Sequence, residues 1–160
     1  MPEMFFVSPS KGRIDYRGMI ADILGYIAAD PESPHKLIVG TDSQVTRDEV
    51  LFVTAVVCHR VGKGARFYYQ KEHHRPIRSL RQRIFYEVSL SLQLAGRVAG
   101  DMAGAGSTVN NLEIHLDIGP QGASSELIRE IVGMVSGSGF DAKIKPDSFG
   151  ASKVADKFTK

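Results

Sequence analysis

The spacing of hydrophobic residues changes along the chain, and each spacing predicts one kind of element. Apolar residues recur every three or four positions over residues 16–29, which predicts an amphipathic helix. Three segments rich in β-branched and aromatic residues follow at 36–42, 50–61 and 65–72. Short polar or glycine-containing turns separate these segments, as they do between paired strands. The sequence therefore predicts a helix followed by three strands in an antiparallel meander.

The second half of the chain alternates between the two spacings. An apolar stripe predicts a long helix over about residues 77–99, and residues 112–118 alternate as a strand. A second helix is expected to open at Ser124, followed by a strand at 140–145 and a last short helix at 149–159. After the first helix the order is thus βββαβαβα. It predicts an α/β fold with a five-stranded mixed sheet, three antiparallel strands followed by parallel ones, and flanking helices.

Length and composition limit the class of protein. A chain of 160 residues can bury the core of a single domain, which we expect to be a domain at 36–160 with an N-terminal helical extension at 1–35. No apolar run approaches the ~20 residues of a membrane span, and the N-terminus lacks a secretion signal. The only cysteine, Cys58, fits a reducing compartment. We therefore expect a cytoplasmic protein without a membrane partner.

Positive charge is concentrated in one segment. The net charge is only +2, but residues 71–83 carry five Lys or Arg against one Glu, so the other residues together are negative. Such a local field attracts a polyanion, although the solvated start of a helix would show the same pattern. The candidate phosphate-binding residues in and beyond this segment are His74, Arg75, Arg78, Arg81, Lys145 and Lys153.

Several acidic residues occupy positions where burial is expected. Asp42 and Asp117 stand at or near the C-terminal ends of predicted strands, and Glu87 lies within or beside the apolar surface of the long helix. Open α/β sheets place their sites at the carboxyl ends of strands. Near the C-terminus, Asp156 and Asp147 are candidates for a fourth acid. Each acid alone could be a turn residue or a solvated side chain, but carboxylates that converge repel one another unless a cation lies between them.

Four motifs in this order resemble a known superfamily. They are TDSQ at 41–44, RIFYEVSLSL at 83–92, IHLDIG at 114–119 and ASKVADKFT at 151–159. Together they resemble the ribonuclease H-like superfamily, and within it most closely the small bacterial YkuK-type proteins, which are predicted nucleases. The resemblance covers about residues 36–160. It departs from the familiar pattern at TDSQ, where a glycine-serine pair usually follows the first acid, and in the N-terminal extension, so the choice of substrate stays open.

The resemblance implies a metal-dependent nuclease. In the superfamily four acids hold two divalent cations, and the matching residues are Asp42, Glu87, Asp117 and Asp156, with Asp147 as the alternative fourth ligand. Carboxylate oxygens without thiolates favour Mg²⁺ or Mn²⁺. Such ions activate water for phosphodiester hydrolysis, so the implied substrate is RNA, DNA or a hybrid.

Other functions are compatible with the same residues. A non-catalytic nucleic-acid-binding or assembly domain could keep the fold, and so could a hydrolase of small phosphate esters. The sequence leaves open whether the chain forms a homo-oligomer. His115, two residues before Asp117, could orient a carboxylate or move a proton, or be a packed imidazole.

Overall fold

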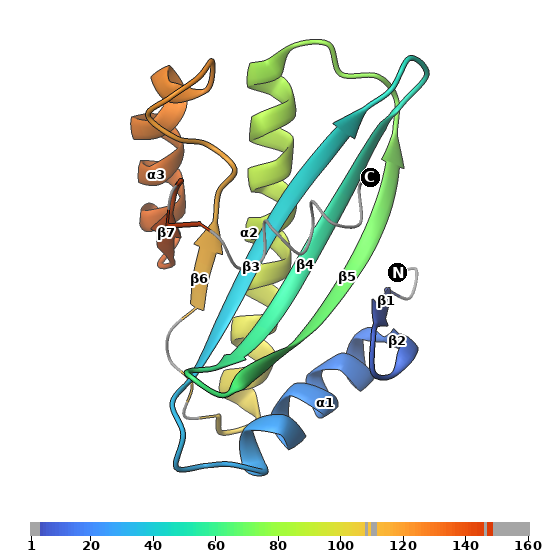
Figure 1. The fold of residues 1–160 in the computed structure, drawn as a ribbon, viewed down its shortest axis with the longest axis vertical. Helices are drawn as coiled ribbons and strands as arrows, with labels where there is room; N and C mark the ends of the chain where they lie inside the picture. The colour runs from blue at the N-terminus through green and yellow to red at the C-terminus, as the bar shows by residue number, and fades with distance from the viewer. Residues whose placement is uncertain (1–3, 108, 110–111, 146, 149–160) are drawn as a thin grey trace.

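The computed structural model describes residues 4–107, 109, 112–145 and 147–148. Along these residues the elements are β1 (Phe5–Ser8), β2 (Gly12–Asp15), α1 (Tyr16–Ala28), β3 (His35–Val45), β4 (Val50–Arg60), β5 (Gly64–His74), α2 (Leu80–Gly104), β6 (Leu112–His115), a 3-10 turn (Ser125–Leu127), α3 (Ile128–Gly137) and β7 (Asp141–Lys143). The strands form one sheet in the order β2-β1-β5-β4-β3-β6-β7 (Figure 1).

The predicted meander is confirmed. β3 pairs antiparallel with β4, and β4 with β5, along their full eleven-residue lengths. In the β4–β5 turn, Gly62 and Gly64 have φ angles of +77° and +111°, which favour glycine over any residue with a Cβ. β6 joins the other edge of β3 in parallel, and β7 joins β6 in parallel. The sheet is therefore mixed, as the element order predicts.

The prediction of five strands is wrong, because the described residues form seven. The additional strands, β1 and β2, form a hairpin before α1, and β1 pairs with β5 at Val7 and Tyr69. Phe6 is fully buried in the same core as Met19 of α1. Each strand has only four residues, too few for its alternation to be distinguished from loop sequence. The hairpin extends the sheet beyond β5.

The helices largely match their predicted positions. α1 is confirmed, whereas α2 starts at Leu80, three residues later than expected, and extends to Gly104. Its start is fixed by Ser79, whose hydroxyl accepts a hydrogen bond from the Gln82 backbone N–H at 3.3 Å. α3 begins after a 3-10 turn. The last predicted helix, at 149–159, lies outside the described residues.

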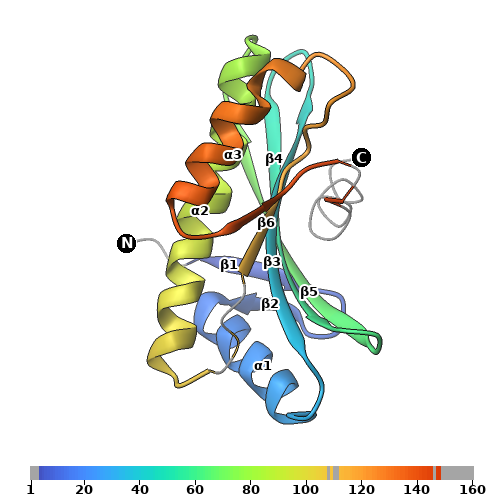
Figure 2. The same ribbon diagram turned by 90° about the vertical axis from the view of Figure 1, so that its left-hand side faces the viewer.

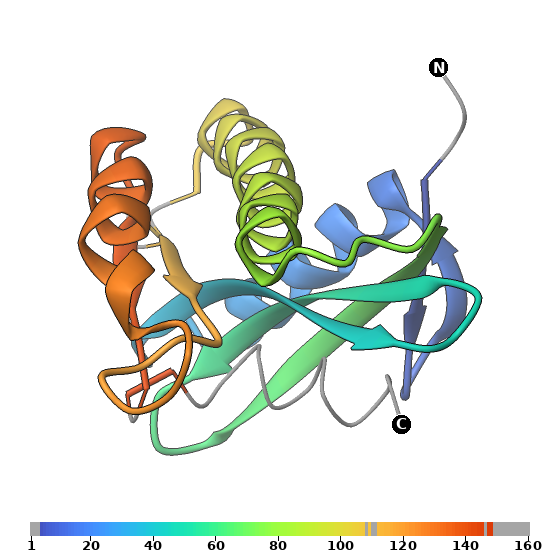
Figure 3. The ribbon, with the colours of Figure 1, turned by 90° about the horizontal axis from the view of Figure 1, so that it is seen from above.

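The three helices lie on one face of the sheet, with the main core between the two layers (Figures 2 and 3). α2 crosses β3, and its first turns come over the end of the molecule where β3 finishes (Figure 1). Val39, Val56 and Ile114 on the sheet pack in one cluster with Val88 of α2. This packing brings the first turns of α2 close to the strand end that carries Asp42. Over the described residues, no helix has both the length and the apolarity needed to cross a membrane.

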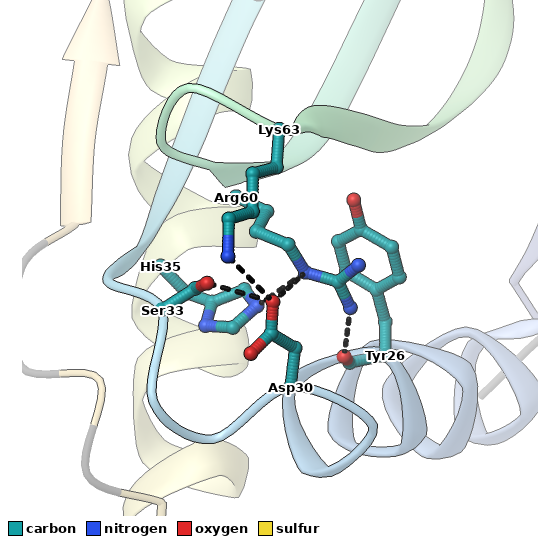
Figure 4. Close-up of polar contacts among 6 residues, drawn as sticks. All are labelled: Tyr26, Asp30, Ser33, His35, Arg60 and Lys63. Carbon is teal, nitrogen blue, oxygen red and sulfur yellow. Dashed lines mark hydrogen bonds and ion pairs between the residues drawn. The ribbon is translucent and has the colours of Figure 1, made fainter.

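The start of β3, opposite this strand end, is anchored by a separate group of polar contacts (Figure 4). Arg60 donates to the Tyr26 carbonyl oxygen at 2.7 Å, and its guanidinium carbon lies 4.0 Å from the centre of the Tyr26 ring. Asp30 accepts from the Ser33 hydroxyl at 2.7 Å and lies 3.7 Å from Arg60 and 3.5 Å from Lys63. These contacts tie the end of α1 to the β4–β5 turn, which is a structural role.

Candidate active site

The end of β3 presents different side chains to the two faces of the sheet. Ser43 faces α2, because its hydroxyl donates to Oε2 of Glu87 at 2.5 Å. Thr41, two residues earlier, also faces α2, and its Oγ1 lies 2.7 Å from the Ser91 hydroxyl. Since successive strand residues alternate, Asp42 points to the opposite face, where it is 7% exposed. Glu87 thus meets the strand through Ser43, beside Asp42.

Asp117 comes next to Asp42 through the parallel pairing of β6. The register aligns Gly40 with His115, so two further residues bring Asp117 level with Asp42. The Leu116 N–H donates to the Lys143 carbonyl at 2.8 Å, so the chain stays beside β7 for one residue beyond β6 before it bends at Asp117. The neighbouring strand ends therefore bring Asp42 and Asp117 together.

The ionisation of Glu87 reflects these surroundings. Burial raises the pKa of Glu87 to about 8, and the Ser43 hydrogen bond partly opposes this rise. The negative charges of Asp42 and Asp117 raise the pKa further, while the Arg83 guanidinium lowers it. Asp42 and Asp117 thus both act electrostatically on Glu87, which holds its proton near neutral pH.

Buried hydroxyl groups, to which the motifs give no role, support this arrangement. Thr41 Oγ1 lies 3.0 Å from the Thr54 hydroxyl as well as 2.7 Å from that of Ser91. Ser91 is one turn after Glu87, so one face of α2 contacts Thr41 and Ser43 in turn. The sequence spacing could have predicted these contacts. Thr41 and Ser43 are two residues apart on one face of a strand, and their partners Ser91 and Glu87 are four residues apart on one face of a helix. These contacts hold α2 in register with β3.

A lysine just after β7 engages Asp117. Lys145 Nζ lies 2.7 Å from Oδ1 of Asp117, and the Lys145 N–H donates to the Ile118 carbonyl at 2.8 Å. Gly119 allows this close approach, because a Cβ added there would lie 2.9 Å from the Cβ of Lys145. Lys145, which the sequence predicts to bind phosphate, therefore forms an ion pair with Asp117, one of the candidate acids.

Behind Asp117, β6 carries a buried charged group. Glu113 lies 3.1 Å from the Lys36 ammonium and 2.9 Å from Nε2 of His115. Although burial opposes it, the hydrogen bonds from His115 and Lys36 lower the pKa of Glu113. Burial lowers the pKa of His115, so the imidazole is neutral at pH 7 and donates to Glu113. His115 is thus a packed imidazole held by its own strand.

The basic segment lies at the junction of β5 and α2. Arg75 and Arg78 are exposed in the connection between these elements. Arg81, in the first turn of α2, forms an exposed ion pair with Glu130 of α3, at 3.0 and 3.2 Å. Nδ1 of His74, the last residue of β5, donates to the Arg75 carbonyl oxygen at 2.8 Å. Arg75 and Arg78 are therefore more accessible to a ligand than Arg81.

Aromatic rings pack beside this segment. The His74 ring lies 4.8 Å from that of Tyr86 and 6.0 Å from that of Phe52, measured between ring centres. The Tyr86 hydroxyl donates to Glu72 on β5. Because Tyr86 precedes Glu87 on α2, these contacts also help to fix the start of the helix over the sheet.

The remaining predicted site residues are near the C-terminus. Asp147 is exposed in the turn after β7, where its N–H donates to the Ile144 carbonyl at 2.7 Å. Asp156 and Lys153 lie outside the described residues. Within the described part of the chain, no three His, Cys, Asp or Glu side chains are grouped closely enough to hold a metal ion.

Comparison with known proteins decides the family. The family model described as ribonuclease H-like matches residues 18–160. The chain belongs to the ribonuclease H-like family. The uncharacterized protein YkuK of Bacillus subtilis (strain 168) is similar to this chain, with 36% identity over 168 residues covering 97% of this chain and 96% of YkuK. No solved structure gave a significant match. The resemblance inferred from the motifs is thereby confirmed.

The donor chemistry fits the divalent metals that ribonuclease H-like proteins typically use. Asp42, Glu87 and Asp117 offer only carboxylate oxygens, which suit Mg²⁺ or Mn²⁺ and not a structural zinc. The charges of Asp42 and Asp117 raise the pKa of Glu87, so a cation among the three acids would relieve their repulsion. The donor type therefore suits a hard divalent cation, although the described side chains do not by themselves form a metal site.

Proposed function

We propose that this protein is a divalent-metal-dependent nuclease that hydrolyses phosphodiester bonds. Membership of the ribonuclease H-like family suggests nuclease activity in general. The observation that supports the metal-dependent form is the placement of Glu87, whose carboxyl group accepts a hydrogen bond from Ser43 on β3 at 2.5 Å and whose pKa is raised by burial and by the charges of Asp42 and Asp117. A carboxyl group held in this way releases its proton more readily when a cation compensates the charge.

The site would hold two ions of Mg²⁺ or Mn²⁺. Three of the ligands would be Asp42, Glu87 and Asp117, and the fourth would be Asp156 or, in its place, Asp147. When bound, such ions lower the pKa of water and stabilise negative charge on the reacting phosphate. The chain's own contribution is orientation. Ser43 fixes the Glu87 carboxylate by a hydrogen bond, and the contact of Thr41 with Ser91 keeps α2 in register with the strand that carries Asp42.

Basic side chains around the acids would bind the nucleic acid backbone. Arg75 and Arg78 are exposed at the start of α2, the helix that carries Glu87. His74 and Arg81 adjoin them, and Lys145 lies on the other side of the acids, against Asp117. Lysine and arginine at such positions neutralise phosphates and make binding depend on salt. A substrate with an extended phosphate backbone therefore suits the site better than a small phosphate ester.

The decisive experiment is a cleavage assay with purified protein. Labelled RNA, DNA and an RNA–DNA hybrid are incubated with Mg²⁺ or Mn²⁺, and at least one should be cut. Asp42→Asn should abolish cleavage with an unchanged circular dichroism spectrum. Asp48→Asn is the matched control, because Asp48 is an exposed acid in the β3–β4 turn. Binding of these substrates without cleavage by either metal would instead identify a nucleic-acid-binding domain.

A further inference from the structure

Two backbone features direct the Lys145 ammonium to Asp117. The Lys145 N–H donates to the Ile118 carbonyl, which sets the backbone beside the end of β6. Gly119 lacks the Cβ that would collide with the lysine stem at 2.9 Å. The ammonium then reaches Oδ1 of Asp117 at 2.7 Å. The position of this charge is thus built into the β6–β7 pairing.

The ion pair is also easy to break. The Lys145 side chain is 59% exposed and that of Asp117 is 35% exposed. Ion pairs of such exposure contribute little to stability, because water and salt screen them. A lysine also has a long flexible stem, so its ammonium can swing to another acceptor while its backbone stays in place. The contact is therefore directed but weak.

Lys145 and a divalent cation would compete for the same carboxylate. Asp117 is one of the three proposed metal ligands, and its Oδ1 atom already contacts the ammonium. A divalent ion carries twice the charge and binds carboxylate oxygens directly. By contrast, the ion pairs of Lys36 with Glu113 and of Arg81 with Glu130 involve acids that are not proposed ligands.

We propose that Lys145 is an exchangeable counter-ion of the acidic site. Its ammonium neutralises Asp117 while no divalent cation is bound, and turns to a phosphate oxygen of the nucleic acid once a cation has taken Asp117. The inference rests on the proposed function and adds an order of events to it. Cation binding releases the lysine, so the site gains a phosphate-binding group only when it is ready to react.

The first test measures cation binding without nucleic acid. Mn²⁺ is titrated into the purified full chain and the free ion is followed by electron paramagnetic resonance. Lys145→Met should bind Mn²⁺ about three- to fivefold more tightly than the wild type, because it removes a weak competitor. Lys143→Met is the matched control, since Lys143 carries the same charge two residues earlier on β7, level with His115. It should change the affinity less than twofold, and Lys145→Arg should resemble the wild type.

The second test asks where the lysine goes. Binding of a labelled single-stranded oligonucleotide is measured in EDTA and with Ca²⁺, a hard cation that uses the same oxygen ligands. With Ca²⁺, Lys145→Met should weaken binding severalfold and lower the slope of log affinity against log salt by about one. In EDTA the same variant should change little. Asp117→Asn, which removes the carboxylate that the lysine contacts, should strengthen binding in EDTA.

The outcomes separate the exchange from the proposed function. Equal Mn²⁺ affinity in Lys145→Met and Lys143→Met overturns the exchange, and so does an equal loss of oligonucleotide binding with and without Ca²⁺. If the wild type meanwhile binds Mn²⁺ and cuts nucleic acid, the proposed function stands. A wild type that neither binds Mn²⁺ nor cuts overturns both. Circular dichroism of each variant verifies that its fold is intact.

Discussion

Glu87 should make the stability of the metal-free protein depend on pH. Its pKa is raised from 4.5 to about 8 in the folded protein, mainly by burial. Between these values the folded state keeps a proton that the unfolded chain has released, so the free energy of unfolding falls as pH rises. At about 1.4 kcal/mol for each factor of ten in proton affinity, the ceiling for this loss is about 5 kcal/mol. Partial access of water to the side chain reduces the expected loss to about half of that.

The perturbation that tests this effect is Glu87→Gln. Glutamine keeps the size of the side chain and an oxygen that can accept the Ser43 hydrogen bond, but it does not ionise. The variant should match the wild type near pH 5 and exceed its stability by about 2 to 3 kcal/mol near pH 8.5. The assay is urea unfolding in EDTA from pH 5 to 9. All other ionisable groups are the same in both proteins, so their contribution cancels in the difference.

A divalent cation provides the internal check. Mg²⁺ that binds only the folded state should raise the stability of the wild type near pH 8.5, and should raise that of Glu87→Gln much less. The reasoning would be refuted by unfolding free energies that run parallel in the two proteins across the pH range. A variant less stable at every pH would likewise show that the charge of Glu87 is well compensated in the fold.

Two further predictions concern the basic segment and the N-terminal hairpin. Arg78→Ala should lower the slope of log affinity against log salt for oligonucleotide binding by about one. Arg81→Ala should lower it by less, because Arg81 is paired with Glu130 of α3. Equal slopes for the two variants in a salt titration would contradict this. Phe6→Ala should destabilise the protein by about 3 to 5 kcal/mol, since Phe6 is fully buried. Phe5→Ala should cost about 1 kcal/mol or less, because Phe5 is 40% exposed. Thermal unfolding compares the two variants, and similar melting temperatures would exclude the hairpin from the core.

The sequence determined those features that depend on neighbours along the chain. The meander, the first helix and the long helix follow from spacing that is visible within ten to twenty residues. The order of these elements also put Asp42 and Asp117 at the ends of strands that turn out to be adjacent. Its motifs sufficed to predict the family that residues 18–160 match.

Tertiary structure decided what depends on contacts between distant segments. The β1–β2 hairpin is stabilised by β5, more than fifty residues away, so its four-residue strands left little local signal. Ser43 with Glu87 and Arg81 with Glu130 meet across separations of 44 and 49 residues. Lys145 reaches Asp117 only through the register of β7 on β6. Local spacing fixes which face of its own element a side chain occupies, but the partner that it meets depends on packing between elements, which only the folded chain defines.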